Sequence, residues 1–301
     1  MLCNEIMSTE VEYISPKTTL REATGRMRDR NIGFLPICDE FGRAIGAITD
    51  RDIAVRAVAR GAPLNAPMEN FMPGELVACR PSDDVERARE LMESSRKSRI
   101  ICTGTDGRLV GVISLSDLAQ VDDQIAGVAL HRVSERTSHV SAAGAERESL
   151  QPSRPLRMQC SELMKTDIEC VSPQTSLRAA AARMRDQQVG FLAVCDEAMR
   201  PVGALTDRDI AVRAVAEGLQ ADTPVEECMT REVIACSPWD SVEYACELME
   251  QHQVSRIVCT NRDRRIEGVI SLSDIVDLDV SSGSRALREI SQREYRGDSI
   301  A

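Results

Sequence analysis

The stretch GAITDRDIAVRAVARG, residues 46–61, returns almost unchanged as GALTDRDIAVRAVAEG at residues 203–218. The two copies are 157 residues apart (203 minus 46), and the same shift carries GFLPICDE at 33–40 onto GFLAVCDE at 190–197 without a gap. Self-similarity at a fixed spacing is typical of a chain built from repeated structural units. We therefore predict that the two halves of the chain share one fold.

A fainter repeat lies within each half. A shift of 65 residues (111 minus 46) carries Gly46 onto Gly111 and Asp52 onto Asp117. The chain is thus predicted to hold four copies of one unit, arranged as two pairs. The copies are expected at about residues 7–61, 72–120, 164–218 and 229–277.

The first copy shows the order of its secondary structure most clearly. Its hydrophobic spacing predicts a strand, a helix, two strands joined by a hairpin, and a second helix. The predicted features are a strand at 10–14 closed by Ser15-Pro16, a helix capped by Thr18 or Thr19, strands at 34–38 and 44–48 around Gly42, and a helix from Thr49 to Gly61. About fifty residues cannot bury both faces of such a sheet, so the units should associate in pairs. The fold class is α/β (α+β), with four βαββα units.

The repeat continues past the last unit of each pair, because ALHRVSER at 129–136 aligns with ALREISQR at 286–293. Each pair is predicted to carry a trailing helix, which gives one module at 1–136 and a second at 160–293. Residues 137–159 are rich in Ser, Ala, Arg and Pro, and we expect a flexible linker that lets the two halves face each other. Residues 294–301 form a tail.

Composition limits the function classes. Of the 301 residues, 43% are hydrophobic, yet no apolar run is long enough to cross a bilayer and no basic-then-apolar leader opens the chain. The expected location is therefore the cytoplasm, with no membrane partner. The net charge of -11 disfavours contact with nucleic acid or an anionic membrane.

Eleven cysteines raise the question of a metal or disulfide framework, but the sequence contains no C-x-x-C pattern. The shift of 157 superimposes four pairs of them: Cys3 and Cys160, Cys38 and Cys195, Cys79 and Cys236, Cys102 and Cys259. Most of these sit in short apolar runs. We interpret them as reduced, buried thiols that act as small hydrophobic side chains, and we expect no metal.

One motif, Gly-h-h-Ser/Thr-x-x-Asp with h an apolar residue, occurs four times at fixed register, as GAITDRD, GVISLSD, GALTDRD and GVISLSD. With the GFLPICDE and GFLAVCDE stretches, it makes the chain resemble the cystathionine-beta-synthase (CBS) domain family, whose units occur in tandem pairs called Bateman modules. The resemblance implies two Bateman modules that bind an adenine-bearing ligand, such as AMP, ADP, ATP or S-adenosylmethionine, in clefts between paired units.

The resemblance also assigns roles to the motif. It implies that the aspartates contact the ribose hydroxyls of the ligand and that the hydroxyl residues contact its ribose or phosphate. The residues concerned are Thr49, Asp52, Ser114, Asp117, Thr206, Asp209, Ser271 and Asp274. A second interpretation stays open, because Ser or Thr followed three residues later by an acidic residue is also a capping box that satisfies free amides at a helix start without any ligand.

Four arginines are candidates for phosphate contact. Arg51 and Arg208 lie in the first turn of a predicted helix, where a cation opposes the helix dipole but would suit a bound phosphate. The alternative is a salt bridge to a nearby aspartate or to a neighbouring unit. Arg99 and Arg256 begin predicted strands, where the family often presents a basic side chain across the pair; an ordinary exposed arginine is the alternative.

The resemblance places Pro36 at the base pocket, and the equivalent residues are Ala193 and Ile101 in other copies. Identical ligand affinity in all four clefts is therefore not expected.

Two functions follow from these observations. The first is a non-catalytic regulatory sensor that binds an adenosyl ligand and signals to a protein partner; the second is a scaffolding protein whose motifs are only helix caps. The chain contains neither a G-x-x-x-x-G-K-S/T loop nor a nucleophile with its base, so no enzyme activity is expected. The apolar stripe of the repeated helices predicts that the modules stack as a disc, within the chain or as a homodimer.

Overall fold

The computed structural model describes residues 1–74, 76–121 and 158–278. The predicted trailing helices at 129–136 and 286–293, and most of the predicted linker, lie outside these residues. The first half contains α1 (Leu20–Asp29), β1 (Phe34–Cys38), β2 (Ala44–Thr49), α2 (Asp50–Asp52), η2 (Ile53–Ala57), η3 (Val58–Arg60), β3 (Ala78–Cys79), α3 (Val85–Ser95), β4 (Arg99–Thr103), β5 (Leu109–Ser114) and α4 (Leu115–Val121), with short 3-10 turns η1 (Cys3–Glu5) and η4 (Met68–Asn70).

The second half repeats this order. It contains α6 (Cys160–Leu163), β6 (Cys170–Val171), α7 (Leu177–Asp186), β7 (Phe191–Cys195), β8 (Pro201–Thr206), α8 (Asp207–Asp209), η6 (Ile210–Val215), η7 (Val225–Glu227), β9 (Ala235–Cys236), α9 (Val242–His252), β10 (Arg256–Thr260), β11 (Ile266–Ser271) and α10 (Leu272–Leu278). In both copies of the sixteen-residue repeat, the helix changes from an α-turn to π geometry, in η2 and in η6. The predicted mixed α/β architecture of four units is confirmed.

Each unit is built around one antiparallel hairpin. In the first unit β1 pairs with β2 from Phe34 opposite Thr49 to Ile37 opposite Gly46. Gly42 turns the hairpin with a φ of +77°, a left-handed conformation that glycine adopts without steric cost. The hairpin ends at Thr49, where the second helix begins, so the motif residues lie at the junction of strand and helix.

The predicted first strand at 10–14 is wrong in extent. Only Ile14 pairs with the sheet, as a single parallel bridge to Ile37. Its N–H donates to the Pro36 carbonyl, and its own carbonyl accepts from the Cys38 N–H. Pro16 has no N–H to continue such a ladder, and the equivalent strands of the other units, β3, β6 and β9, are two residues long.

The first helix of each unit has a defined start and end. Thr19 caps α1, and a capping box joins it to Glu22. The first helices are followed by a non-glycine residue in the left-handed region, namely Asn31, Arg96, Gln188 and Gln253. The chain reverses direction at these residues and enters the central hairpin.

Paired units exchange their leading segments. The motif glycine Gly111 of the second unit leaves space for Met7, which begins the first unit, and a Cβ on this glycine would come within 2.7 Å of the Met7 sulfur. Met72 packs in the same way on Gly46 of the first unit. The second half repeats both contacts, with Met164 on Gly268 and Met229 on Gly203. Each unit of a pair is thus completed by residues from the other.

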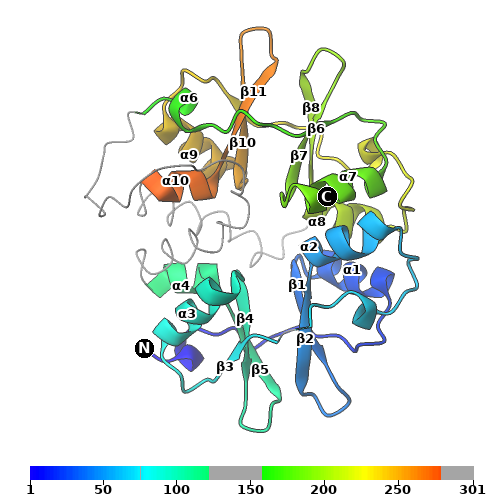
Figure 1. Ribbon diagram of the computed structural model, residues 1–301. Helices are drawn as coiled ribbons and strands as arrows, with labels where there is room; N and C mark the ends of the chain where they lie inside the picture. Colours follow the sequence, from blue (N-terminus) through cyan, green and yellow to red (C-terminus); the bar gives the residue numbers. More distant parts are fainter. Residues whose placement is uncertain (75, 122–157, 279–301) are drawn as a thin grey trace.

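The two modules form a disc in which all hairpins point outward and the helices face the middle (Figure 1). One apolar core spans the first and third units, whereas the second and fourth units have separate cores. The repeated helices lie at the module boundary, but each packs mainly on the first helix of the opposite module: α1 against η6, and α7 against η3 and η2. The modules therefore meet crosswise within one chain.

The contacts at this boundary predict how the first half of the chain behaves when it is expressed alone. The Arg28 guanidinium lies 2.6 Å from Glu217 across the boundary, and Glu217 is replaced by Arg60 in the first module. Residues 1–140 alone are expected to form a homodimer through α1, η2 and η3, in which Arg28 would face Arg60 of the second copy. The R60E variant should tighten this dimer about threefold or more, because two repulsions become two ion pairs.

Sedimentation equilibrium on both half-chains, at low and high salt, measures this. A half-chain that stays monomeric with either residue at position 60 contradicts the prediction.

Candidate functional site

The four Ser/Thr-x-x-Asp motifs form helix caps. The Thr49 hydroxyl accepts from the Asp52 N–H at 3.1 Å and donates to Asp52 Oδ2 at 2.7 Å, and Oδ2 also accepts from the Thr49 N–H. The same network joins Thr206 to Asp209, Ser114 to Asp117 and Ser271 to Asp274. The capping interpretation therefore has direct structural support, and the ribose contact stays a prediction.

Asp52, Asp209 and Asp274 each contact a cation through the second carboxylate oxygen, Oδ1. Asp52 Oδ1 lies 3.0 Å from Arg56, and Asp209 Oδ1 lies 3.2 Å from Arg213. Asp274 Oδ1 lies 2.7 Å from the Lys165 ammonium. These cations are 45 to 52% exposed on their side chains, so they can move into solvent if another hydrogen-bond donor takes their place.

The arginines of the repeated motif cross the module boundary. Arg51 lies 3.8 Å from Asp207 of the opposite module, and Arg208 lies 3.9 Å from Asp50. A Cβ on Gly33 would come within 3.1 Å of the Arg208 guanidinium, and one on Gly190 within 3.2 Å of Arg51. In the structure, Arg51 and Arg208 thus form salt bridges to a neighbouring unit, which was the alternative interpretation. Phosphate contact by these arginines stays a prediction.

Two carboxylates at this boundary hold their protons unusually well. Burial raises the pKa of Asp50 to about 7; the nearby Asp207 carboxylate adds to the rise, and Arg208 and Arg99 oppose it. Burial also raises the pKa of Asp207, against the opposing charges of Arg256 and Arg51. The charges of all four candidate arginines therefore lower the pKa values of one pair of aspartates, against the effect of burial.

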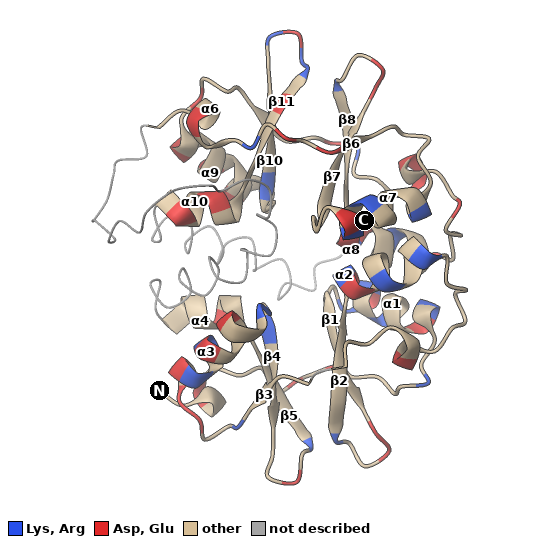
Figure 2. Cartoon of the chain, viewed as in Figure 1, with Lys and Arg blue, Asp and Glu red and all other residues tan. Residues whose placement is uncertain are grey.

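Arg99 and Arg256 begin β4 and β10, and Figure 2 shows basic segments at the inner ends of these strands. The Arg256 guanidinium lies 6.0 Å from the centre of the Phe191 ring in the paired unit. Burial lowers the pKa of Arg256, and the charges of Asp207 and Asp274 oppose this. Arg256 therefore contacts the paired unit through Phe191, and its contact with a phosphate stays a prediction. Pro36 is buried in β1 opposite Ala47.

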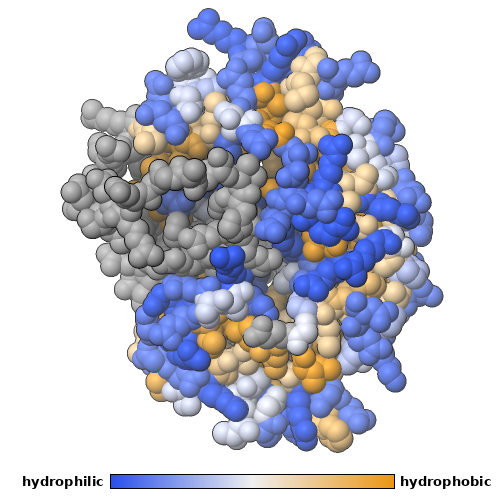
Figure 3. All heavy atoms as spheres, in the orientation of Figure 1, coloured by the Kyte–Doolittle hydropathy of each residue, from blue (hydrophilic) through white to orange (hydrophobic). Residues whose placement is uncertain are grey.

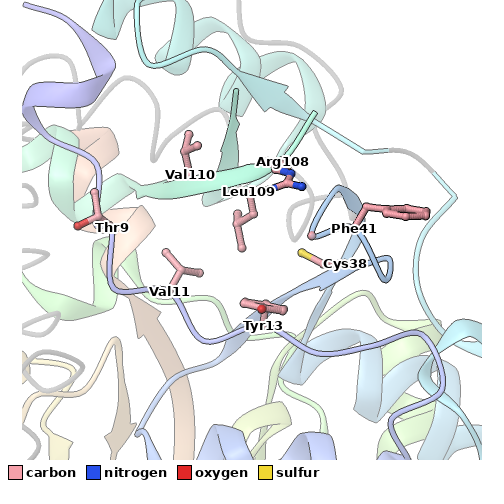
Figure 4. Close-up of a pocket in the computed structure, with 9 residues that line it drawn as sticks. Thr9, Val11, Tyr13, Cys38, Phe41, Arg108, Leu109 and Val110 are labelled. Atoms are coloured by element: carbon pink, nitrogen blue, oxygen red, sulfur yellow. The ribbon is translucent and has the colours of Figure 1, made fainter. Parts of the chain in front are cut away.

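An outer cavity of about 280 Å³ lies between the leading segment of the first unit and the two hairpins of the first module. Its lining includes Val11, Tyr13, Cys38 and Leu109, and Figure 4 shows Val11, Cys38 and Leu109 pointing toward one another across it. None of these residues belongs to the repeated motif. The sequence does mark this position as different between the two halves. The shift of 157 replaces Tyr13 by Cys170, which changes the size and chemistry of the side chain.

A second cavity, of about 380 Å³, lies where the first three units meet. Its lining includes Arg51, Arg96 and Arg185. Strongly hydrophilic side chains gather around α1, α2 and α7 on the face shown in Figure 3. The sequence indicated Arg51 alone, because Arg96 and Arg185 end first helices that carried no motif.

Within residues 1–74, 76–121 and 158–278, no helix is both long enough and apolar enough to cross a membrane. No group of three or more His, Cys, Asp or Glu side chains in the same ranges could hold a metal ion.

Comparison with known proteins gives four matches to the CBS domain family model, at residues 3–58, 68–123, 160–215 and 225–281. The CBS domain-containing protein YhcV of Bacillus subtilis is 35% identical over 137 residues, which cover 45% of this chain and 96% of that protein. The uncharacterized protein MJ1225 of Methanocaldococcus jannaschii is 25% identical over 206 residues, or 68% of this chain and 67% of that protein. Its crystal structure covers 92% of this chain and 99% of its own, with a TM-score of 0.63 and 17% identity, so the two share a fold.

The half-buried Asp50 and Asp207 predict a dependence of stability on pH. Because folded Asp50 keeps its proton up to about pH 7 while the unfolded carboxyl releases it near 3.8, the unfolded state binds fewer protons between these values. The contribution of Asp50 to the free energy of unfolding therefore falls as the pH rises from about 4 to about 7. Asp50→Asn should stabilise the protein by at least ~1 kcal/mol more at pH 8 than at pH 5.

Urea unfolding at pH 5, 6, 7 and 8 measures this difference. Glu40→Gln, which removes an exposed carboxylate of the first hairpin, is the matched control. Parallel pH curves for wild type and Asp50→Asn would show that Asp50 ionises normally in the fold.

Proposed function

Because the chain belongs to the CBS domain family, we propose that it is a non-catalytic regulatory protein that binds an adenosine-containing ligand between paired units. Ligand binding changes the contact between the modules, and a protein partner reads this change. The observation that carries the proposal is the convergence of Arg51, Arg99, Arg208 and Arg256, one from each unit, on Asp50 and Asp207.

The charges at this centre favour an incoming phosphate. Four guanidinium groups act on two carboxylates, and burial makes the ionised form of those carboxylates costly. The Arg51–Asp207 and Arg208–Asp50 separations of 3.8 and 3.9 Å are too long for good hydrogen bonds. A phosphate group can accept shorter, bidentate hydrogen bonds from the same arginines. It would then replace the aspartates and release the contact between modules.

The helix caps supply the second part of the proposed site. When Asp52 and Asp209 accept the cap hydrogen bonds through Oδ2, their Oδ1 atoms remain for a ribose hydroxyl. The ligand would displace the exposed side chains of Arg56 and Arg213, which lose little because surface ion pairs are weak. Capping and ribose binding are thus compatible in one carboxylate.

None of the eleven cysteines forms a disulfide, and all but Cys170 are buried. Reduced thiols in this number suit a reducing compartment, so we place the protein in the cytoplasm.

The complete capping networks favour a second candidate function, a scaffold that binds no nucleotide. Calorimetry with AMP, ADP, ATP, S-adenosylmethionine and adenosine separates the two. Asp52→Ala should lower the affinity for the ligand by ~1.5–3 kcal/mol, the cost of a lost hydrogen bond to a charged group. It should lower unfolding stability by only about 1 kcal/mol, the value of a cap.

Thr19→Ala is the matched control, because it removes a helix cap that is not part of the motif. The scaffold is the better description if none of the five ligands binds, or if both variants lose stability and keep full affinity.

The phosphate role of the strand arginines has its own test. Arg256→Gln should weaken AMP and ATP binding about tenfold or more and leave adenosine binding nearly unchanged, because only the phosphorylated ligands use the charge. Exposed Arg262→Gln, in the loop of the same hairpin, serves as control. Equal weakening of all three ligands by Arg256→Gln would assign Arg256 to the packing of Phe191 instead.

A further inference from the structure

The thiols of Cys170 and Cys195 lie beside each other in the third unit, with 3.4 Å between their sulfur atoms. We infer that this pair is an oxidative modification site, at which a peroxide converts the two thiols into a disulfide. Neither a ligand in the clefts nor the arginines at the module boundary take part in this reaction. The site is therefore independent of the proposed function.

The register of the sheet places the two thiols on one face. β6 pairs in parallel with β7, with Cys170 opposite Ala193 and Val171 opposite Val194. Alternate residues of a strand point to the same face of a sheet, so Cys195 lies on the same face as Ala193 and Cys170. Val171 and Val194 belong to the apolar core that spans the first and third units. The two thiols therefore meet on the other face. Bond formation shortens their separation from 3.4 Å to about 2.0 Å, the length of a disulfide.

The two thiols differ in exposure and in acidity. Cys170 is half-buried, whereas Cys195 is only 3% exposed. The Cys195 thiol donates a hydrogen bond to the Cys170 sulfur, which lowers the pKa of Cys170. The charge of Arg183 acts in the same direction, against burial and the charge of Glu169. The same hydrogen bond and burial raise the pKa of Cys195. Because the thiolate is the reactive form of cysteine, Cys170 reacts first and Cys195 completes the disulfide.

The reaction with hydrogen peroxide has two steps. The Cys170 thiolate attacks one peroxide oxygen, the O–O bond breaks, and hydroxide leaves and takes up a proton as water. The product is a sulfenic acid on Cys170. The Cys195 sulfur then attacks the sulfenic sulfur, the S–O bond breaks, and hydroxide leaves with the Cys195 proton as a second water. Both sulfurs are oxidised and the peroxide is reduced. A dithiol can reverse the disulfide by thiol–disulfide exchange, as a reducing compartment requires.

Two other pairs of thiols are as close but are enclosed. The sulfur atoms of Cys79 and Cys102 lie 3.2 Å apart, and those of Cys236 and Cys259 lie 3.5 Å apart. All four residues are buried, in the separate cores of the second and fourth units. A peroxide has to reach the thiolate that attacks it. Oxidation is therefore expected at Cys170 before these two pairs react.

The first module lacks the pair. The shift of 157 carries Cys38 onto Cys195, but the residue at the position of Cys170 is Tyr13. Tyr13 and Cys38 both line the outer cavity of the first module (Figure 4). Burial raises the pKa of Cys38 to about 11, so this thiol keeps its proton at neutral pH. We expect one disulfide for each chain, in the second module.

The test is peptide mass spectrometry of the full chain. The protein is reduced, freed of the reductant, treated with hydrogen peroxide and alkylated with iodoacetamide before digestion. Wild type should yield one peptide pair joined through Cys170 and Cys195, and dithiothreitol should remove the link. In Cys195→Ser, Cys170 should stop at the sulfenic acid, which dimedone traps. Tyr13→Cys, which recreates the pair beside Cys38, should gain a second link. Absence of that second link would contradict the role given to register and exposure.

Cys228→Ser is the matched control, because it removes a buried thiol outside the pair. It should leave the link between Cys170 and Cys195 unchanged. Cys170→Ser should slow the loss of free thiols in peroxide about tenfold or more, because it removes the exposed thiolate. Circular dichroism verifies that each variant is folded. The inference is overturned if wild type forms no link between Cys170 and Cys195, if Cys79 and Cys102 become linked as fast, or if Cys170→Ser loses thiols at the wild-type rate.

Discussion

The apolar contact between the first and third units is the constraint on which the rest of the molecule depends. Their helices share one core, with α1 on η6 and α7 on η3. A unit of about fifty residues has too little interior to cover its helix face alone, so this face has to be covered by another copy. Once the contact forms, the starts of the repeated helices are brought together. The ion pairs between Arg51 and Asp207, and between Arg208 and Asp50, follow from that position.

These ion pairs place charge where the fold would otherwise need only apolar packing. Two aspartates are partly withdrawn from water close to each other, and their raised pKa values show that the arrangement is costly. The fold tolerates this because four arginines surround them. Under the proposed function an anion would relieve this cost, and binding could then change the contact between the modules.

Much of the fold could be predicted from the sequence, because the repeat shows the same hydrophobic spacing four times. The hairpin at Gly42 and the helix start at Thr49 follow from local chemistry. The first strand was overestimated, since pairing at Ile14 depends on which carbonyls the sheet leaves open. The crosswise packing was also missed: the apolar stripe of the repeated helix shows that it needs cover, but not which helix provides it.

The residues assigned to the candidate site from the motif stay a prediction, and their contacts could not be predicted from the sequence. The motif showed Arg51 in an unfavourable place, but its partner Asp207 is far away in sequence and only the folded chain brings them together. Arg96 and Arg185 could not be singled out, because arginine at the end of a helix is common and favourable. Only the folded chain brings these two residues together, in the cavity where the first three units meet.

The exchange of leading segments sets the size of the piece that evolution can copy. Met7 fills the space at Gly111, and Met72 fills the space at Gly46. A single excised unit would therefore lack the methionine that packs on its own glycine. Its own methionine would have no glycine to pack on. Only a pair supplies both of these methionine–glycine contacts. A gene duplication that copied one unit would give a defective product, whereas one that copied a pair would give a second working module at once. The nearly unchanged stretch at 46–61 and 203–218, against the faint likeness between neighbours within a pair, fits a history in which the pair was the inherited unit.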